Sequence, residues 1–155
     1  MSEKPREIRS IAQNRKARFA FHILEELECG LSLQGTEVKS LRDGQGSLAE
    51  AYARIVKDEL WLVGMHIPEY AHGNVHNHKP TRDRKLLAHR REIAKWHKAV
   101  KEKGVTLVPL EVYFKGSKVK VKIGLCRGKK LYDKRQVQKD RSDKRAIDRA
   151  MSRRR

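Results

Sequence analysis

The last 29 residues of the chain, 127–155, are too charged to be part of a packed core. They hold 13 Lys or Arg residues and 4 Asp residues, a net charge of +9, which is half of the +18 of the whole chain. Such a segment has too little apolar surface to offset the entropy lost on folding, so it becomes ordered only against a polyanion. Residues 128–155 are therefore expected to form a basic tail that is disordered in the free protein. RNA or DNA is the expected partner, because Lys and Arg gain affinity by displacing counterions from phosphates.

The rest of the chain is expected to form one folded domain, residues 14–127, after a flexible polar segment over residues 1–13. A pI of about 10.3 fits the electrostatic footprint of a nucleic-acid-binding protein. Residues 1–13 lack the apolar stretch of a signal peptide, and no apolar run approaches the roughly 20 residues of a membrane span. A cytoplasmic protein that acts as a monomer is expected, with no membrane partner.

The pattern of apolar residues favours a mainly β fold. Residues 19–33 partly alternate, which predicts a long half-buried strand. Glycines bound a predicted short helix over residues 36–42, capped by Thr36. A heptad spacing of Leu86, Ile93 and Val100 predicts the clearest helix, over residues 84–103. Further strands are predicted over 51–56, 59–67, 105–114 and 118–126. A long surface loop is predicted over 68–83. An OB-fold-like antiparallel barrel with about three helices is the expected architecture, because closure removes exposed strand edges; an open α+β sheet is the alternative.

Two charged clusters are candidates for RNA contact. Lys118, Lys120 and Lys122 alternate with apolar residues, which places three cations on one face about 6.6 Å apart at the rise of a strand. This spacing resembles that of phosphates along one strand of a duplex, although a plain solvated face is the alternative. In the second cluster, Glu28 lies beside Glu25 and Glu26. A carboxylate there would accept hydrogen bonds from base or ribose donors, and simple balance of surface charge is the alternative.

No combination of residues indicates catalysis, a metal site or a cofactor. The histidines at 66, 72, 76 and 78 fit no zinc-binding spacing, and a polar loop is the favoured interpretation. Cys29 and Cys126 form no CxxC pair and are expected to be small buried thiols. Tyr132, by contrast, is the single aromatic residue of the basic tail, where it is suited to stack on a base.

Six motifs resemble the SsrA-binding protein family, also called small protein B. Three carry most of the likeness: GTEVKSLR (35–42), RKLLAHRREI (84–93) and GKKLYDKR (128–135). NRKAR (14–18), ELWL (59–62) and KVKIGL (120–125) strengthen it, and the resemblance extends from about residue 14 to the end of the chain. Ala88 and His89 stand where some members carry Leu and Asn.

The resemblance implies a non-enzymatic bacterial RNA-binding factor with an OB-fold barrel. The family binds the tRNA-like end of transfer-messenger RNA, supports the alanylation of that RNA by alanyl-tRNA synthetase, and supports its delivery with elongation factor Tu to stalled ribosomes. The implied RNA-facing residues are Glu28, Glu37, Lys39, Arg42, Leu87 and His89. The tail is implied to enter the 16S rRNA decoding region and the empty message channel, beginning with Gly128, Lys129, Lys130, Tyr132, Asp133, Lys134 and Arg135.

Three other functions remain compatible with the residues alone. A ribosomal or ribosome-assembly protein would bind ribosomal RNA permanently, without preference for a tRNA-like RNA. An RNA-modifying enzyme or hydrolase would need an acid/base or metal set, for which the sequence offers no pattern. A membrane-surface protein would need an amphipathic helix with bulky apolar residues opposite its charges, and the tail is poor in these.

Overall fold

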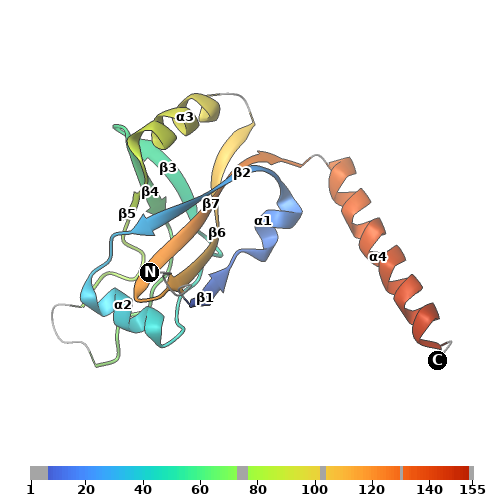
Figure 1. Ribbon diagram of the computed structural model, residues 1–155, viewed down its shortest axis with the longest axis horizontal. Coiled ribbons are helices and arrows are strands. Elements are labelled where there is room, and N and C mark those ends of the chain that lie inside the picture. The colour runs from blue at the N-terminus through green and yellow to red at the C-terminus, as the bar shows by residue number, and fades with distance from the viewer. Residues whose placement is uncertain (1–6, 73–76, 102–103, 130, 154–155) are drawn as a thin grey trace, which may run out of the picture.

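The computed structural model describes residues 7–72, 77–101, 104–129 and 131–153. Seven antiparallel strands have the order β1-β6-β3-β4-β5-β2-β7, and β6 also pairs with β7, so that six strands close into a ring (Figure 1). The strands are β1 (Ile8–Gln13), β2 (Phe21–Leu31), β3 (Tyr52–Val56), β4 (Glu59–Val63), β5 (Arg84–Leu87), β6 (Val105–Lys115) and β7 (Lys118–Gly128). The prediction of a mainly β, barrel-like fold is therefore confirmed.

The barrel interior is filled by alternate residues of the ring strands. In β7, Val119, Val121 and Ile123 are buried while Lys118 is exposed and Lys120 and Lys122 are half-buried, which confirms the predicted alternation. Helices α2 (Gly35–Arg42) and α3 (Arg90–Val100) lie at opposite ends of the barrel in Figure 1. They contribute buried apolar side chains to the same core, namely Leu41, Ile93 and Trp96.

Several element boundaries differ from the sequence predictions. Residues 8–13, expected to be flexible, form β1 and pair with β6. The strand predicted over 19–33 begins only at Phe21, because α1 (Arg15–Ala20) precedes it. Asn14 begins this helix, since its side chain accepts a 3.2 Å hydrogen bond from the amide of Ala17 and donates one of 3.1 Å to the carbonyl of Pro109. A helix of six residues is too short for an apolar period to reveal it.

The helix predicted over 84–103 is wrong for its first residues. Residues 84–87 form β5, which pairs with β4 and β2, and α3 begins only at Arg90. The heptad spacing of Leu86 and Ile93 misled the prediction, because both are buried but from different elements. Arg84, the first residue of the predicted helix, instead lies on β5 with its side chain fully buried.

The hairpin between β3 and β4 agrees with the prediction. Its two turn residues, Lys57 and Asp58, have φ values of 49° and 62°, the left-handed conformation of a two-residue type I′ turn. The second strand ends at Val63, earlier than predicted, because Gly64 has φ of 81°. A Cβ at Gly64 would lie 2.5 Å from the carbonyl oxygen of Glu50, so only glycine fits there.

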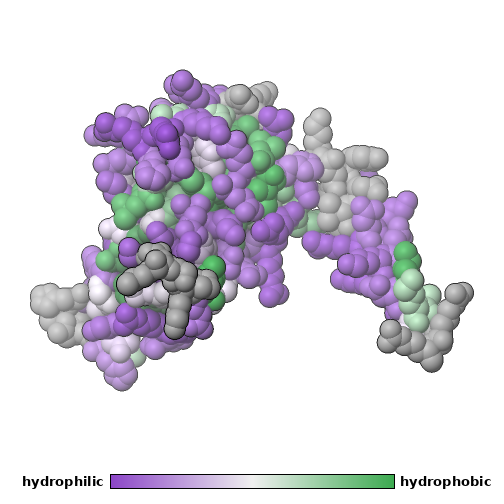
Figure 2. Space-filling view, viewed as in Figure 1, coloured by the Kyte–Doolittle hydropathy of each residue, from purple (hydrophilic) through white to green (hydrophobic). Residues whose placement is uncertain are grey.

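The basic tail forms helix α4 (Leu131–Arg153), which extends away from the barrel in Figure 1. The structure thus has a helix where the sequence predicts disorder in the free protein. The Lys, Arg, Gln and Ala content of the segment favours a helix by itself. The helix is not held by a core, since Ile147 and Met151 are 57% and 67% exposed. Hydrophilic residues cover most of α4 in Figure 2, with an apolar patch near its outer end.

Candidate nucleic-acid interface

A groove of about 400 Å³ lies between β2, β5, β7 and the start of α2. Its centre is Gly30, which pairs with Leu87 on one side and with Lys120 on the other. A Cβ at Gly30 would lie 3.2 Å from the Cβ of Leu87, so the glycine lets the strands pack closely and keeps the floor low. The groove brings together three of the predicted RNA-facing residues: Leu87, Lys118 and Lys120.

A second hollow of about 510 Å³ adjoins this groove and shares Ser117 with it. Arg9 and Arg42 line it, and the Arg9 guanidinium donates a 2.7 Å hydrogen bond to the carbonyl of Arg42. The two hollows therefore place Arg9, Arg42, Lys118 and Lys120 on one connected surface around an apolar floor. Cations beside an apolar surface suit phosphates and stacked bases. Sequence reasoning missed Arg9, because it lies in the segment expected to be flexible.

Glu28, on β2, is held by two neighbours in β6. The Tyr113 hydroxyl donates a hydrogen bond to its carboxylate, and Lys115 Nζ lies 3.1 Å from Oε1. The hydrogen bond from Tyr113 is the main cause that lowers the pKa of Glu28, and Lys115 lowers it further. Burial and the adjacent carboxylate raise the pKa of Tyr113. Glu28 is thus a fixed, ionised acceptor at the side of the barrel that carries Lys120 and Lys122. No pattern in the sequence indicates the role of Tyr113.

Glu37 does not face solvent, so its side chain is not accessible for the predicted contact with RNA. It is fully buried, and its carboxylate accepts hydrogen bonds from Arg82 and from Arg84. Burial alone would raise the pKa of Glu37, but hydrogen bonds from the Gln34 amide and the two guanidinium groups outweigh it, so the pKa is lowered. Glu37 is therefore a structural anion that fixes α2 to β5 and to the loop before β5.

The other predicted residues of α2 and α3 are accessible. Lys39 and Arg42 are exposed on the outer side of α2, and Lys39 Nζ lies 5.7 Å from the centroid of the Tyr70 ring. His89 is exposed at the start of α3, two residues after Leu87, and its side chain makes no capping hydrogen bond. Lys122 on β7 lies directly opposite Glu28 on β2.

The root of the tail is fixed to α1. Gly128 ends β7 opposite Phe21. The amide of Lys129 donates a 2.9 Å hydrogen bond to the carbonyl of Ala20, and its Nζ donates one of 3.2 Å to the carbonyl of Arg18. Lys130 lies outside the described residues. Tyr132, Asp133 and Lys134 belong to the first turns of α4, but their side chains are outside the described part of the structure, whereas Arg135 is exposed.

The described residues do not form a metal site. Among residues 7–72, 77–101, 104–129 and 131–153, no group of His, Cys, Asp and Glu is arranged to hold an ion. Both cysteines are buried, as predicted, and burial raises the pKa of Cys29 to about 12 and that of Cys126 to about 11. Within the same described ranges, no helix has the length and apolar character needed to cross a membrane.

His78 is the one described loop histidine that is buried. Its ring nitrogens lie 2.9 Å from the Thr36 hydroxyl and 2.8 Å from the carbonyl oxygen of Ile67. It therefore fastens the loop to α2, while His66 and His72 are exposed and His76 lies outside the described residues.

Comparisons with known proteins show the family of the chain. The family model described as "SmpB protein" matches residues 11–153. A protein of Kineococcus radiotolerans called SsrA-binding protein is 55% identical over 144 residues, which cover 93% of this chain and 92% of the relative. One of Carboxydothermus hydrogenoformans with the same name is 52% identical over 141 residues, 91% of this chain and 95% of the relative.

A solved structure is also similar. One chain of "tmRNA-SmpB: a journey to the center of the bacterial ribosome" is 45% identical, with a TM-score of 0.65, over 77% of this chain and 84% of that chain.

Proposed function

Because the chain belongs to the SmpB protein family, we propose that it is a cytoplasmic RNA-binding factor of ribosome rescue. It binds the tRNA-like domain of transfer-messenger RNA through the connected groove and hollow. The observation that carries this proposal is the clustering of Arg9, Arg42, Lys118 and Lys120 around an apolar floor. The protein is a binding factor and not an enzyme, and it requires no cofactor.

This surface is better suited to a folded RNA than to a duplex whose base sequence is recognised in a groove. Its cations come from β1, α2 and β7, so they contact phosphates that are brought together by the fold of the RNA. Glu28 supplies an ionised acceptor for amino groups or 2′-hydroxyl groups, and exposed Leu87 supplies apolar contact for a base. Shape, phosphate and 2′-hydroxyl contacts are how proteins commonly recognise folded RNA. Lys39, His89 and Lys122 extend this surface.

RNA binding in the groove and hollow supports the alanylation and delivery of the RNA indirectly. The protein holds the tRNA-like domain in the form that alanyl-tRNA synthetase charges and that elongation factor Tu carries to the ribosome. Both proteins reach this chain through the RNA. The basic tail then enters the decoding region of the ribosome, where Tyr132 stacks on a base and Lys134 and Arg135 contact ribosomal RNA. Helix α4 supports this, because its 23 residues form a straight arm of about 34 Å.

Selection of stalled ribosomes follows from the size and charge of this arm. A channel that still holds message has no room for a helix. An empty channel offers both space and ribosomal phosphates. The tail therefore senses the absence of message. Contact with ribosomal RNA stabilises the ordered form of the tail.

A binding experiment separates RNA recognition by the barrel from the ribosomal role of the tail. The isolated tRNA-like domain and an ordinary tRNA of equal length are compared in about 0.2 M salt, which suppresses non-specific attraction. The full chain and a chain ending at Lys129 are used, because the shorter chain keeps both hydrogen bonds between Lys129 and α1. Strong preference for the tRNA-like domain, retained without the tail, is expected.

Two outcomes would contradict the proposal. Equal weak binding to both RNAs, lost with the tail, would mean an unspecific charge-driven binder. Chemical change of the RNA by the purified protein would mean an enzyme. For the tail, Tyr132→Ala is expected to leave RNA binding unchanged and to reduce peptide tagging on ribosomes stalled at the end of a message; unchanged tagging would remove Tyr132 from the mechanism.

A further inference from the structure

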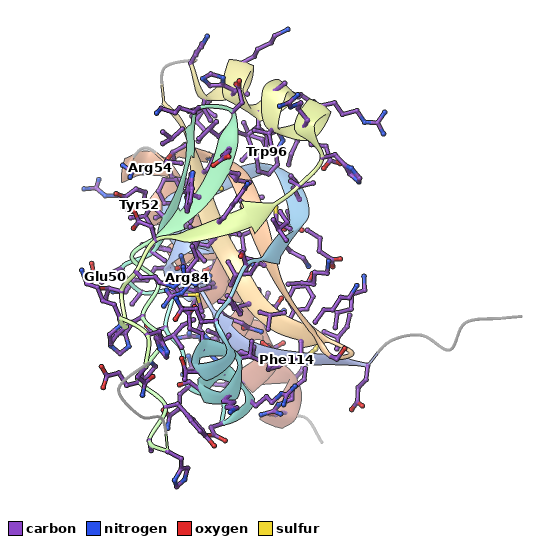
Figure 3. The ribbon with its side chains drawn as sticks, turned by 90° about the vertical axis from the view of Figure 1, so that its left-hand side faces the viewer. Glu50, Tyr52, Arg54, Arg84, Trp96 and Phe114 are labelled. Carbon is purple, nitrogen blue, oxygen red and sulfur yellow. The ribbon has the colours of Figure 1, made fainter. Side chains whose placement is uncertain are left out.

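The outer side of the β3–β4 hairpin is an apolar surface on a very basic protein. Its outward residues, here called the hairpin face, are Tyr52, Arg54, Val56, Glu59, Trp61 and Val63. They form three cross-strand pairs: Tyr52 with Val63, Arg54 with Trp61 and Val56 with Glu59. The residues between them, such as Leu60 and Leu62, fill the core. Figure 3 shows Tyr52 and Arg54 at the outer edge of the hairpin.

Two large apolar side chains of this face are open to solvent. Tyr52 is 48% exposed and Val56 is 40% exposed. Trp61 is half-buried between Arg54 on β3 and Lys85 on β5, its cross-strand neighbours. The outer face of a barrel strand is normally polar, and aromatic residues clustered at the surface are typical of protein-binding sites.

The charge of the hairpin face distinguishes it from the RNA-facing groove. Residues 50–63 hold Glu50, Asp58 and Glu59 against Arg54 and Lys57, a net charge of −1 within a chain of +18. Arg54 is the one cation of the hairpin face, and it lies 3.7 Å from Asp83, while the neighbouring Lys85 on β5 lies 3.4 Å from Glu59. Affinity for RNA comes largely from cations that displace counterions. On the hairpin face, cations do not outnumber acidic residues.

The order of the strands places the two surfaces on different sides of the barrel. Around the ring β2-β7-β6-β3-β4-β5, strand β4 is three steps from β7, and β3 is three steps from β2. The groove is formed largely by β2 and β7, which carry Gly30, Lys118 and Lys120. A ligand in the groove therefore leaves the hairpin face open, and both can be occupied together.

We propose that the hairpin face docks a protein partner, with Tyr52, Val56 and Trp61 packing on an apolar patch that is bordered by Lys or Arg side chains. Tyr and Trp are the residues most often responsible for the energy of such contacts. The acids of residues 50–63 meet the basic border. This inference goes beyond the RNA-binding function, and its test on ribosomes rests on the proposed role in ribosome rescue.

Photochemical cross-linking tests the class of the partner. A photoreactive phenylalanine analogue replaces Val56 in the full chain, and the protein is bound to purified bacterial ribosomes together with transfer-messenger RNA. After irradiation and RNase digestion, a discrete protein adduct that is identified by mass spectrometry is expected. The same analogue at Ser117, which lines the groove, is expected to give adducts that RNase removes. At Val56, RNA adducts, adducts with a second copy of the chain, or no adduct would each overturn the proposal.

An affinity measurement provides an independent test. Tyr52→Ser combined with Val56→Ser is expected to weaken binding to ribosomes at least tenfold, while affinity for the isolated tRNA-like domain changes less than twofold. Leu24→Ser is the matched control, because Leu24 is 49% exposed but lies on β2. Unfolding by urea verifies that the variants are folded. Unchanged ribosome binding would overturn the proposal, as would an equal loss of RNA affinity.

Discussion

Replacing Glu37 by Gln tests whether this residue is structural or contacts RNA. Its Oε1 accepts hydrogen bonds from the Gln34 amide at 2.9 Å and from Arg82 Nε at 3.1 Å, and its Oε2 accepts one from Arg84 Nε. Arg84 also donates to the carbonyls of Met65 at 2.7 Å and Pro80 at 3.0 Å. In Glu37→Gln the shape is kept, but an amide NH₂ group now faces Arg84 Nε and the buried guanidinium loses its counter-charge.

The expected loss of stability is large. Both side chains of the Glu37–Arg84 pair are 0% exposed, and removal of one partner from a buried ion pair costs about 3–5 kcal/mol. This is a large share of the roughly 5–15 kcal/mol by which a domain is stable. At about 2–4 °C per kcal/mol for a chain of this size, the melting temperature falls by about 6–20 °C.

The control is an exposed ion pair of the same barrel. Arg18 and Glu26 lie 3.7 Å apart, with side chains 63% and 39% exposed, so Glu26→Gln is expected to cost below about 1 kcal/mol. Urea unfolding gives both values. Under conditions where Glu37→Gln is folded, its affinity for the tRNA-like domain is expected to stay within twofold of the parent. A loss of stability below about 1 kcal/mol would refute the argument from burial. A tenfold loss of RNA affinity in the folded variant would mean that Glu37 contacts the RNA.

The same pair sets a pH dependence. The pKa of Glu37 in the folded protein is lower than its usual 4.5, since its hydrogen bonds outweigh the effect of burial. The stability that it contributes is therefore complete above about pH 4.5 and is lost as the pH falls through the folded pKa. The parent protein should lose stability in acid more steeply than Glu37→Gln. Parallel curves would show that another group controls the acid limb.

Three further predictions concern single groups. Lys118→Gln and Lys120→Gln are each expected to reduce the slope of log affinity for the tRNA-like domain against log salt by about 1; an unchanged slope would place these side chains away from phosphates. Tyr113→Phe is expected to raise the pKa of Glu28 toward 4.5, because it removes the main hydrogen bond that lowers it; an NMR titration of the carboxyl carbon measures this, and no change would mean that Lys115 alone fixes the carboxylate. The thiol of Cys29, whose pKa burial raises to about 12, is expected to resist iodoacetamide at pH 8 until urea unfolds the protein, and labelling at the rate of a free thiol would contradict its burial.

Regular local patterns could be predicted from the sequence. The alternation in β7 identified both the buried Val119, Val121 and Ile123 and the three lysines on the other side. The two glycines around α2 indicated its length, and the helix begins within a residue of the prediction, but its N-cap is Gln34 and not the predicted Thr36. These features depend on neighbours a few residues apart, so they are visible in the chain itself.

Features that depend on distant residues could not be predicted. Arg84 is buried because it meets Glu37, which lies 47 residues away, and no local pattern distinguishes it from a surface arginine. The same holds for Tyr113, whose hydroxyl reaches Glu28 across 85 residues. The groove depends on Gly30 standing between Leu87 and Lys120. Glu28, Glu37, Leu87 and Lys120 were predicted as candidates, but Arg84, Tyr113 and Gly30 were not, because their contacts depend on pairing between distant segments.

The attachment of Lys129 to α1 fixes the starting point of the tail, and where the helix runs on from Lys129 it also sets the direction of each side chain. Each residue of an α-helix advances by about 1.5 Å and turns by about 100°. Removal of residues from the free end of α4 therefore shortens its reach gradually, and the remaining side chains keep their directions. One residue gained or lost between Lys129 and the helix would instead turn every side chain of α4 to a new direction. About three or four residues added there would nearly restore the phase and lengthen the arm by one turn.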